Sequence, residues 1–353
     1  MRSSILKQGG PYKVRKTGRD KYSLSIPMPE GEHGRVARKC PNDICSPGYF
    51  KVKPGTGITD GQEVAYCPYC YHRDSPNEFV TEEQVRYASE IVAREAEQGI
   101  QSMIGDALGV GHSGKKKFGG GMFSIEMKYK PGRLRHVRRP LEEELQRDVI
   151  CPHCGLDYAV FGLAMWCSDC GEDIFLTHIA AEFNVVAAIL SHVDRRRETL
   201  GPRVAARDLE NCLEDTVSIF EAAGKAVVTR SLRERGKSIE EVQRFLKKVV
   251  RNSFQSIWRI TELLRTEFDI YLREHHSEDT LVGLTKIFEK RHPITHNLGV
   301  VDRKYLGKAL SAEKEGREIR VTKDEVESAM TTAKDLLGTL HSLLISSLSL
   351  GKE

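Results

Sequence analysis

Residues 151–171 read CPHCGLDYAVFGLAMWCSDCG, in which two Cys-x2-Cys turns stand twelve residues apart. Such a turn aims two sulfurs to the same side of the backbone, and Gly155 and Gly171 follow the turns where a positive φ is required. Four thiolates at this spacing are typical of a tetrahedral zinc site on a short apolar hairpin. A redox pair does not need the second turn, and disulfides are disfavoured in a cytosol-like chain. The expected ligands are Cys151, Cys154, Cys167 and Cys170.

A second, looser cysteine cluster lies upstream, with CPNDIC at 40–45 and YCPYC at 66–70. The wider gap in its first turn is one that zinc sites tolerate, and the residues between the turns alternate like a two-stranded hairpin. The expected ligands are Cys40, Cys45, Cys67 and Cys70. In both clusters four thiolates fill the coordination shell and leave no open position for water or substrate. The sequence therefore predicts two structural Zn²⁺ ions and no catalytic metal.

The formal charge of +4 on the 353 residues is not evidence of a nucleic-acid partner. Eight thiolates would remove eight charges and two Zn²⁺ would add four, which brings the net charge to about zero. No run of 18 apolar residues is present, and the N-terminal MRSSILKQGG lacks a signal-peptide core. We therefore expect a cytoplasmic protein with no membrane partner.

Helical periodicity begins after the first cluster. Residues 79–108 predict a helix, with Thr81 and Gln84 as a capping-box signature at its start. The Gly/Lys-rich residues 109–121 break all periodicity and predict a flexible loop. Residues 122–130 then alternate as a strand.

From about residue 177 onward the pattern is helical almost throughout, with 194–203 as the expected linker. A helix near 212 carries Cys212 on its apolar stripe, so we interpret Cys212 as a buried structural cysteine rather than a nucleophile. Residues 238–275 predict either one long amphipathic helix or two helices joined at Asn252-Ser253. Their apolar face is expected to hold Val242, Phe245, Leu246, Val249, Phe254, Ile257, Trp258, Leu264, Phe268 and Tyr271. Thr322 with Glu325 is a second capping box, opening the closing helix.

The predicted fold class is therefore multidomain, with two small β zinc ribbons followed by an all-α helical bundle. The expected domains are a first ribbon at 1–80, a helix and loop at 81–121, a basic strand segment and second ribbon at 122–176, a connecting helix and linker at 177–202, and the helical domain at 203–353.

The strongest local concentration of positive charge lies between residues 113 and 139, with nine Lys or Arg and one acid, Glu126. Cations on an accessible loop or strand can follow a phosphate backbone. The alternative is a solvated loop, partly neutralised by the acidic LEEE at 141–144. The candidate nucleic-acid-binding residues are Lys115, Lys116, Lys117, Lys128, Lys130, Arg133, Arg135, Arg138 and Arg139.

KRHPITHNLG, residues 290–299, gathers polar residues around a proline late in the helical region. Arg291 and His296 are five residues apart, so on an uninterrupted helix they would point about 140° from each other. Pro293 disfavours helix at His292 and fits the first turn of a new helix, so a break here would let Arg291 and His296 converge. A histidine can move the proton of a ribose 2′-OH or of a leaving group, and an arginine can pair with phosphoryl oxygens, so the pair suits RNA cleavage without a metal. The alternative is structural, with Arg291 and His296 capping helices and pairing with Glu289 or Asp302.

Arg291-His292-x3-His296-Asn297 resembles the Arg-polar-x3-His signature of the HEPN (higher eukaryote and prokaryote nucleotide-binding) superfamily, and the resemblance covers about 203–350. The resemblance implies an all-α bundle that dimerises around a shared cleft, and in many members a metal-independent ribonuclease of toxin, antiphage or RNA-processing systems. By this resemblance Arg291 and His296 are the catalytic pair, His292 is the polar position and Asn297 a flanking support. A bare pattern of this kind also matches Arg147 and His153, at the second cysteine cluster, where it is incidental.

We therefore expect an endoribonuclease that leaves a 2′,3′-cyclic phosphate, acts as a homodimer and uses its zinc ribbons to recognise RNA or a protein partner. The first alternative is a non-catalytic nucleic-acid- or protein-binding adaptor whose bundle only dimerises. The second is a toxin-like subunit silenced by a regulatory, antitoxin-like partner.

Overall fold

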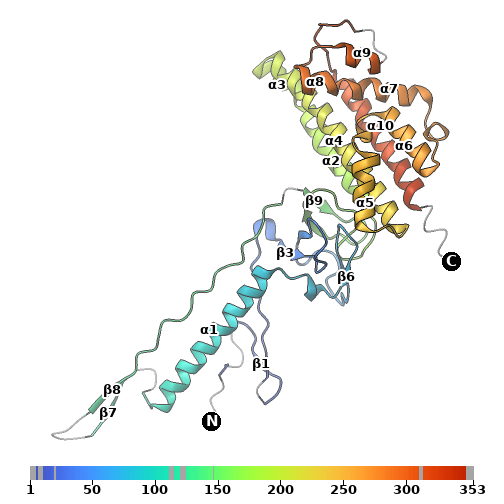
Figure 1. Ribbon diagram of the computed structural model, residues 1–353. Coiled ribbons are helices and arrows are strands. Elements are labelled where there is room, and N and C mark those ends of the chain that lie inside the picture. The colour runs from blue at the N-terminus through green and yellow to red at the C-terminus, as the bar shows by residue number, and fades with distance from the viewer. Residues whose placement is uncertain are drawn as a thin grey trace. The chain divides into compact units, whose positions relative to one another are not determined.

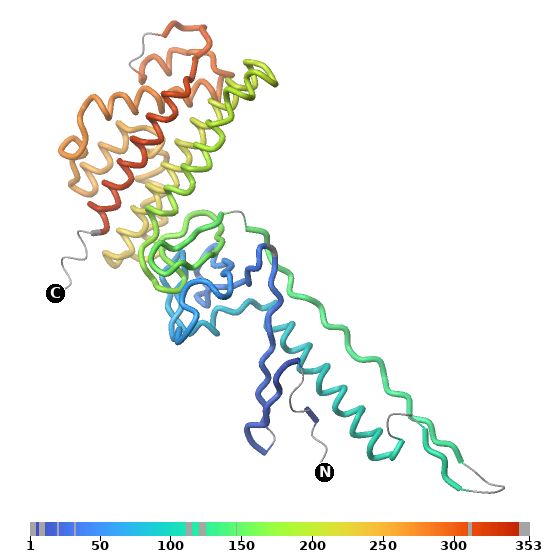
Figure 2. Tube along the Cα trace, turned by 180° about the vertical axis from the view of Figure 1, so that it is seen from behind, coloured from blue at the N-terminus to red at the C-terminus, as the bar shows by residue number. Residues whose placement is uncertain are grey.

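The computed structural model describes residues 5–6, 11–19, 21–110, 115–119, 125–145, 147–309 and 313–346. The chain forms two compact units, shown in Figures 1 and 2. Unit 1 comprises Met1–Gly162 with Trp166–Glu172, and unit 2 comprises Leu163–Met165 with Asp173–Glu353. Unit 1 holds small sheets and the cysteine clusters and unit 2 is helical, so the predicted order of β elements before helices is confirmed.

Unit 1 is built on one antiparallel four-stranded sheet of order β3-β4-β10-β9. These strands are β3 (Val36–Lys39), β4 (Tyr49–Val52), β9 (Arg147–Ile150) and β10 (Asp157–Val160). The two cysteine clusters, expected in separate ribbons, thus contribute strands to a single sheet, with Tyr158 of β10 paired to Val52 of β4. Phe50 and Tyr158 are fully buried in its core.

Short elements surround this sheet. They are β1 (Arg15–Lys16), β2 (Tyr22–Ser23), η1 (Glu32–Gly34), β5 (Ala65–Tyr66), β6 (Arg73–Asp74), η2 (Pro76–Phe79), α1 (Glu82–Ala107), β7 (Lys115–Phe118) and β8 (Ile125–Lys128). The capping box that opens α1 is confirmed, because the Thr81 hydroxyl accepts from Gln84 N and the Gln84 side chain accepts from Thr81 N. The predicted loop at 109–121 is wrong for Lys115–Phe118, which pairs with β8. The predictions for 111–114 and 120–124 lie outside the described residues.

Unit 2 is a helical bundle organised around a long central helix, α4, which packs against α2, α3 and α10. Its elements are α2 (Phe175–Ser191), α3 (Val193–Leu200), α4 (Pro202–Glu234), α5 (Ile239–Phe245), η4 (Leu246–Val250), η5 (Ser253–Gln255), α6 (Ile257–Phe268), η6 (Leu272–Glu274), α7 (Glu278–Glu289), α8 (Arg291–Asn297), α9 (Arg303–Ala309), α10 (Lys323–His341) and η7 (Ser342–Ser346). Cys212 is fully buried on α4 as predicted, and burial raises the pKa of its thiol to about 11.

Three helix predictions can be compared with the bundle. The expected linker at 194–203 is wrong, because its Arg- and Glu-rich residues form α3; only Gly201, at φ 96°, separates α3 from α4. Residues 238–275 form two helical segments rather than one, and Arg251, at φ 48°, ends the first of them. The capping box of Thr322 and Glu325 on α10 is confirmed.

Within the described residues, Phe175–Leu200 is the one helical stretch whose length and composition would allow it to cross a bilayer. Ile179, Phe183 and Val186 on this stretch are buried inside unit 2, and residues 195–197 are three consecutive arginines. A core helix of a bundle passes the same test of length and composition, so this stretch is weak evidence for a membrane protein.

Candidate functional site

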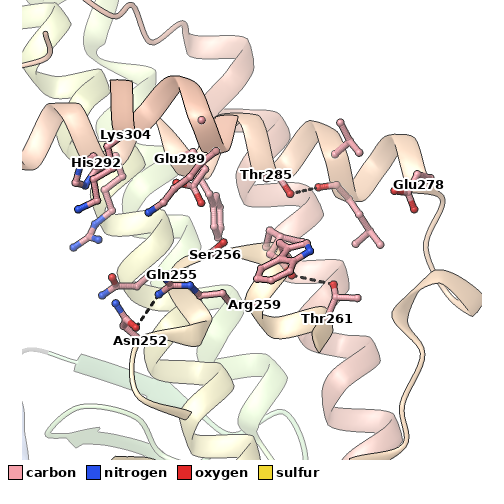
Figure 3. A pocket seen from close by; sticks show the side chains of 18 of the residues that line it. Asn252, Gln255, Ser256, Arg259, Thr261, Glu278, Thr285, Glu289, His292 and Lys304 are labelled. Atoms are coloured by element: carbon pink, nitrogen blue, oxygen red, sulfur yellow. Dashed lines mark hydrogen bonds between the residues drawn. The ribbon is translucent and has the colours of Figure 1, made fainter. Parts of the chain in front are cut away.

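A cavity of about 670 Å³ opens in unit 2 between α6, α7, α8 and α9. Figure 3 shows Arg259 and Asn252 facing His292 and Lys304 across it, with Glu278 toward the other end. The ionisable side chains that line it are Arg259, Arg273, Glu278, Glu289, Arg291, His292, His296, Lys304 and Lys308. The predicted Arg291, His292 and His296 therefore reach one cavity, whereas Asn297 does not line it.

The local backbone of this motif differs from the prediction. Arg291–Asn297 is one continuous helix, and the break lies upstream at Lys290, between α7 and α8. Pro293 does occupy the first turn, as predicted, because a residue in that turn needs no N–H donor within the helix. Leu298, at φ 49°, ends the helix, where Gly299 N donates to Pro293 O over 2.8 Å.

Helix geometry therefore brings together a different pair from the one expected. His292 and His296 are four residues apart on α8, and their ring centroids lie 5.1 Å from each other. Arg291 and His296 line the same cavity, but no hydrogen bond joins them among the described residues. Asn297 donates from Nδ2 to Val300 O over 2.8 Å, so it supports the end of the helix.

His292 differs from His296 in its surroundings. The His292 side chain is 22% exposed, whereas His296 is open to solvent. Burial lowers the pKa of His292, and the neighbouring Lys304 lowers it further; Asp302, whose Oδ2 lies 3.9 Å from His292 Nε2, opposes this only in part. A pKa lowered from the usual 6.5 favours the neutral ring at pH 7, in which one nitrogen is unprotonated and can accept a proton.

Cations outnumber acids in this cavity. Arg273 is neutralised by Glu278, with an Nε to Oε2 distance of 2.8 Å. Arg259 donates to the neutral Asn252 Oδ1 over 3.0 Å and keeps its charge. In the part of the chain that the structure describes, no ion pair is found for the remaining three cations, which are Arg291, Lys304 and Lys308. Glu289 alone does not balance these four charges, so the cavity favours an anion.

Trp258, Arg259, Lys304 and Lys308 line the cavity beside the motif and were not expected at this site. Trp258, predicted on the apolar face of its helix, is 70% exposed and lines the cavity. The reason lies in the helix register: α6 buries Ile257, Ile260 and Leu264, and Trp258 follows Ile257 by about 100°. Its neighbour Arg259 shares the exposed face. The helical spacing of Ile257, Ile260 and Leu264 in the sequence was the signal that would have placed Trp258 outside the buried face of α6.

The predicted grouping of the cysteines is confirmed. In each group of four, the Sγ atoms all lie within 4.8 Å of one another. Cys151 and Cys170 are 3.7 Å apart at Sγ, and Cys154 and Cys167 are 3.5 Å apart. A tetrahedron of sulfurs at metal–sulfur bonds of 2.3 Å has edges of about 3.8 Å, so these groups could each hold a metal ion. Gly155 and Gly171 have the positive φ values expected after their turns, 77° and 72°.

The predicted nucleic-acid-binding cations lie in unit 1. Lys115, Lys116 and Lys117 are on β7 and Lys128 is on β8, whereas Lys130, Arg133, Arg135, Arg138 and Arg139 are on an extended segment at 129–141 that we term the strap. All are exposed except Lys116, which is half-buried and whose ammonium lies 4.7 Å from the centre of the Phe118 ring.

The strap runs antiparallel to α1 (Figures 1 and 2). Glu83, Glu90 and Glu97 of α1 accept hydrogen bonds from the backbone N–H groups of residues 141, 138 and 135. Seven residues of helix rise about 10.5 Å and three extended residues span about 10 Å. Successive glutamates of α1 therefore stay opposite successive backbone N–H groups of the strap.

Neutralisation of the strap therefore comes from α1 rather than from the acidic 141–144 segment. Arg135 pairs with Glu97 at 3.2 Å. Glu142 instead binds Lys51 of the sheet, at 3.0 Å. Lys130, Arg133 and Arg139 have exposed side chains, and no ion pair is found for them within the described ranges.

Comparisons of this chain with protein-family models, with curated proteins and with solved structures found no match. The resemblance to the HEPN superfamily accordingly rests on the motif in α8 and its position in a helical bundle.

Proposed function

We propose that the protein is an endoribonuclease whose reaction takes place in the cavity between α6 and α9, with no metal ion needed for the cleavage step. The observation that carries the proposal is the composition of this cavity. Two imidazoles 5.1 Å apart stand beside Arg291, Lys304 and Lys308, for which the described residues provide no ion pair, in a space large enough for part of an RNA chain. This is the set of groups that phosphodiester cleavage by a 2′-OH requires.

The reaction would divide between the two imidazoles. Neutral His292 takes the proton of the ribose 2′-OH, and the 2′-oxygen attacks the adjacent phosphorus. Arg291 pairs with the non-bridging oxygens as negative charge builds on them. The bond to the 5′-oxygen breaks, His296 in its protonated form supplies the proton to that oxygen, and a 2′,3′-cyclic phosphate remains. The requirement for a 2′-OH restricts the substrate to RNA.

The remaining parts of the chain have supporting roles in this proposal. Zn²⁺ in the two four-cysteine groups would stabilise unit 1, and the exposed cations of β7, β8 and the strap would hold RNA. By the resemblance to the HEPN superfamily, unit 2 would form a homodimer and would bind a regulatory protein partner. The cytoplasmic location is proposed from the lack of an 18-residue apolar run and of a signal-peptide core in the sequence. A toxin, antiphage or RNA-processing role follows from the same resemblance.

The test is cleavage of a mixed pool of single-stranded RNA in EDTA, with the new ends analysed for 2′,3′-cyclic phosphate. Arg291→Ala and His296→Ala should each lower the cleavage rate by about 10²- to 10⁴-fold. The matched control is His275→Ala, because His275 is an exposed histidine of unit 2 outside the cavity lining. Cleavage that persists undiminished in either active-site variant would refute the assignment. RNA binding without cleavage would favour the alternative, a nucleic-acid-binding adaptor.

A further inference from the structure

Trp258 is an unusual residue to find open to solvent. Its side chain is 70% exposed although its neighbours Ile257 and Ile260 are buried. Exposure of so large an apolar ring forgoes the stabilisation that burial would give. Trp258 is also not on an isolated convex surface, because it lines the same cavity as His292 and His296. A flat aromatic face at the wall of an anion-attracting cavity is suited to a ligand that combines a planar ring with negative charge.

The polar groups around Trp258 point to the same class of ligand. Arg259 follows it on α6 and is held by Asn252 through one hydrogen bond of 3.0 Å, which leaves the other guanidinium N–H groups available. Lys304, which Figure 3 shows, supplies charge from α9, and Lys308 of the same helix also lines the cavity. A nucleotide presents a base for the indole and a phosphate for these cations. An acidic peptide would use the cations but would cover the indole only if it also carried an aromatic side chain.

We infer that Trp258 and Arg259 form a nucleotide-binding subsite in which one unpaired RNA base stacks on the indole and an adjacent phosphate binds the guanidinium. The inference rests on the proposed function, since it supplies the substrate class of the neighbouring site. Bases in a duplex are stacked on one another and do not offer a free face, so the subsite selects single-stranded RNA. Trp258 and Arg259 are thus positioning residues that set which phosphodiester reaches the imidazoles.

The experiment uses the full chain and an oligonucleotide that has 2′-O-methyl groups throughout and therefore cannot be cleaved. The protein contains two tryptophans, Trp166 and Trp258, so Trp258→Phe leaves Trp166 as an internal reference. In the wild type, stacking should quench tryptophan fluorescence, and in Trp258→Phe the quenching should vanish while the affinity is largely retained. Trp258→Ala should bind about 5- to 150-fold more weakly, the range expected for loss of one stacked base. Circular dichroism of each variant checks the fold, which an exposed side chain should not disturb.

Two comparisons separate stacking from charge. An oligonucleotide of equal length with abasic sites keeps the phosphates but lacks bases, and it should bind the wild type and Trp258→Ala equally weakly. Tyr271→Ala removes another exposed aromatic of unit 2, one outside the cavity lining, and should leave the affinity unchanged. Equal affinity of the wild type for the abasic and the intact oligonucleotide, or unchanged affinity in Trp258→Ala, overturns the inference.

Failure of the proposed function has a different signature. Quenching by the uncleavable oligonucleotide with no cleavage of any RNA would support the subsite and refute catalysis. Cleavage that depends on His296, with KM unchanged in Trp258→Ala, would support catalysis and refute the subsite.

Discussion

The two lysines of α9 provide a quantitative test of whether the cavity binds a phosphate backbone. Lys304 and Lys308 are exposed, line the cavity, and have no ion pair within the part of the chain that is described. Their charges are therefore available to a polyanion without the loss of an internal interaction. Substituting both by alanine should weaken RNA binding while leaving the fold of unit 2 intact.

The size of the effect follows from counterion release. The logarithm of the binding constant of single-stranded nucleic acid falls with the logarithm of salt concentration by about 0.7 for each phosphate neutralised. If each lysine neutralises one phosphate, the double variant Lys304→Ala/Lys308→Ala should show a slope about 1.4 less steep than the wild type. The difference in slope between the wild type and the double variant isolates the contribution of the α9 lysines, because the cations of the strap contribute equally to both proteins.

The assay is fluorescence anisotropy of a labelled, uncleavable oligonucleotide at several salt concentrations. Lys286→Ala/Lys334→Ala is the charge-matched control, because both lysines are exposed in unit 2 and neither lines the cavity. Its slope should equal that of the wild type within error. Equal slopes in the wild type and both double variants would show that RNA does not contact the α9 lysines, and the reasoning from cavity charge would be refuted.

Three further predictions concern protonation and metal. The pKa of His292 is lowered from its usual 6.5, and the neutral ring is the proposed base. The cleavage rate should therefore fall as the pH is lowered, with a midpoint below about 6.5. In His292→Ala this acid limb of the pH–rate profile should be absent. Burial alone would raise the pKa of Asp173, but hydrogen bonds from His341 and Arg230 outweigh it and lower the value to about 2, below the unfolded 3.8; the ionised carboxylate therefore stabilises unit 2 at neutral pH. Asp173→Asn should lower the free energy of unfolding, measured with denaturant at pH 7, by about 2 kcal/mol. This difference between wild type and variant should narrow as the pH falls from about 4 to about 2. A difference that stays constant with pH would contradict the prediction. Titration of the thiols with a mercurial should release two metal ions per chain and unfold unit 1 while the helical signal of unit 2 persists; release of no metal would refute structural zinc.

Features that depend on neighbouring residues could be predicted from the sequence. The Cys-x2-Cys turns, the glycines after them and the capping boxes at Thr81 and Thr322 each involve groups a few residues apart, so local geometry determines them. The order of β elements before helices followed from the same local signals. The helix at 193–200 was missed because its arginines and Gly201 read as a linker, although arginine and glutamate favour helix.

Features that depend on distant residues were decided only by the tertiary structure. Whether two cysteine clusters form two sheets or one depends on the pairing of β4 with β10, across about a hundred residues, and no local pattern reports such a pairing. The strap is held by glutamates of α1 because two separate segments share a common spacing, which appears only once they lie side by side.

The candidate site shows the same division. The sequence by itself singled out Arg291, His292 and His296, because residue type and spacing are enough to suggest their chemistry. The structure showed that His292 and His296 lie side by side, since the helix begins before Pro293 and places residues four apart on one face. It also decided that Trp258, Lys304 and Lys308 share the cavity, because they come from helices whose packing no single stretch of sequence specifies.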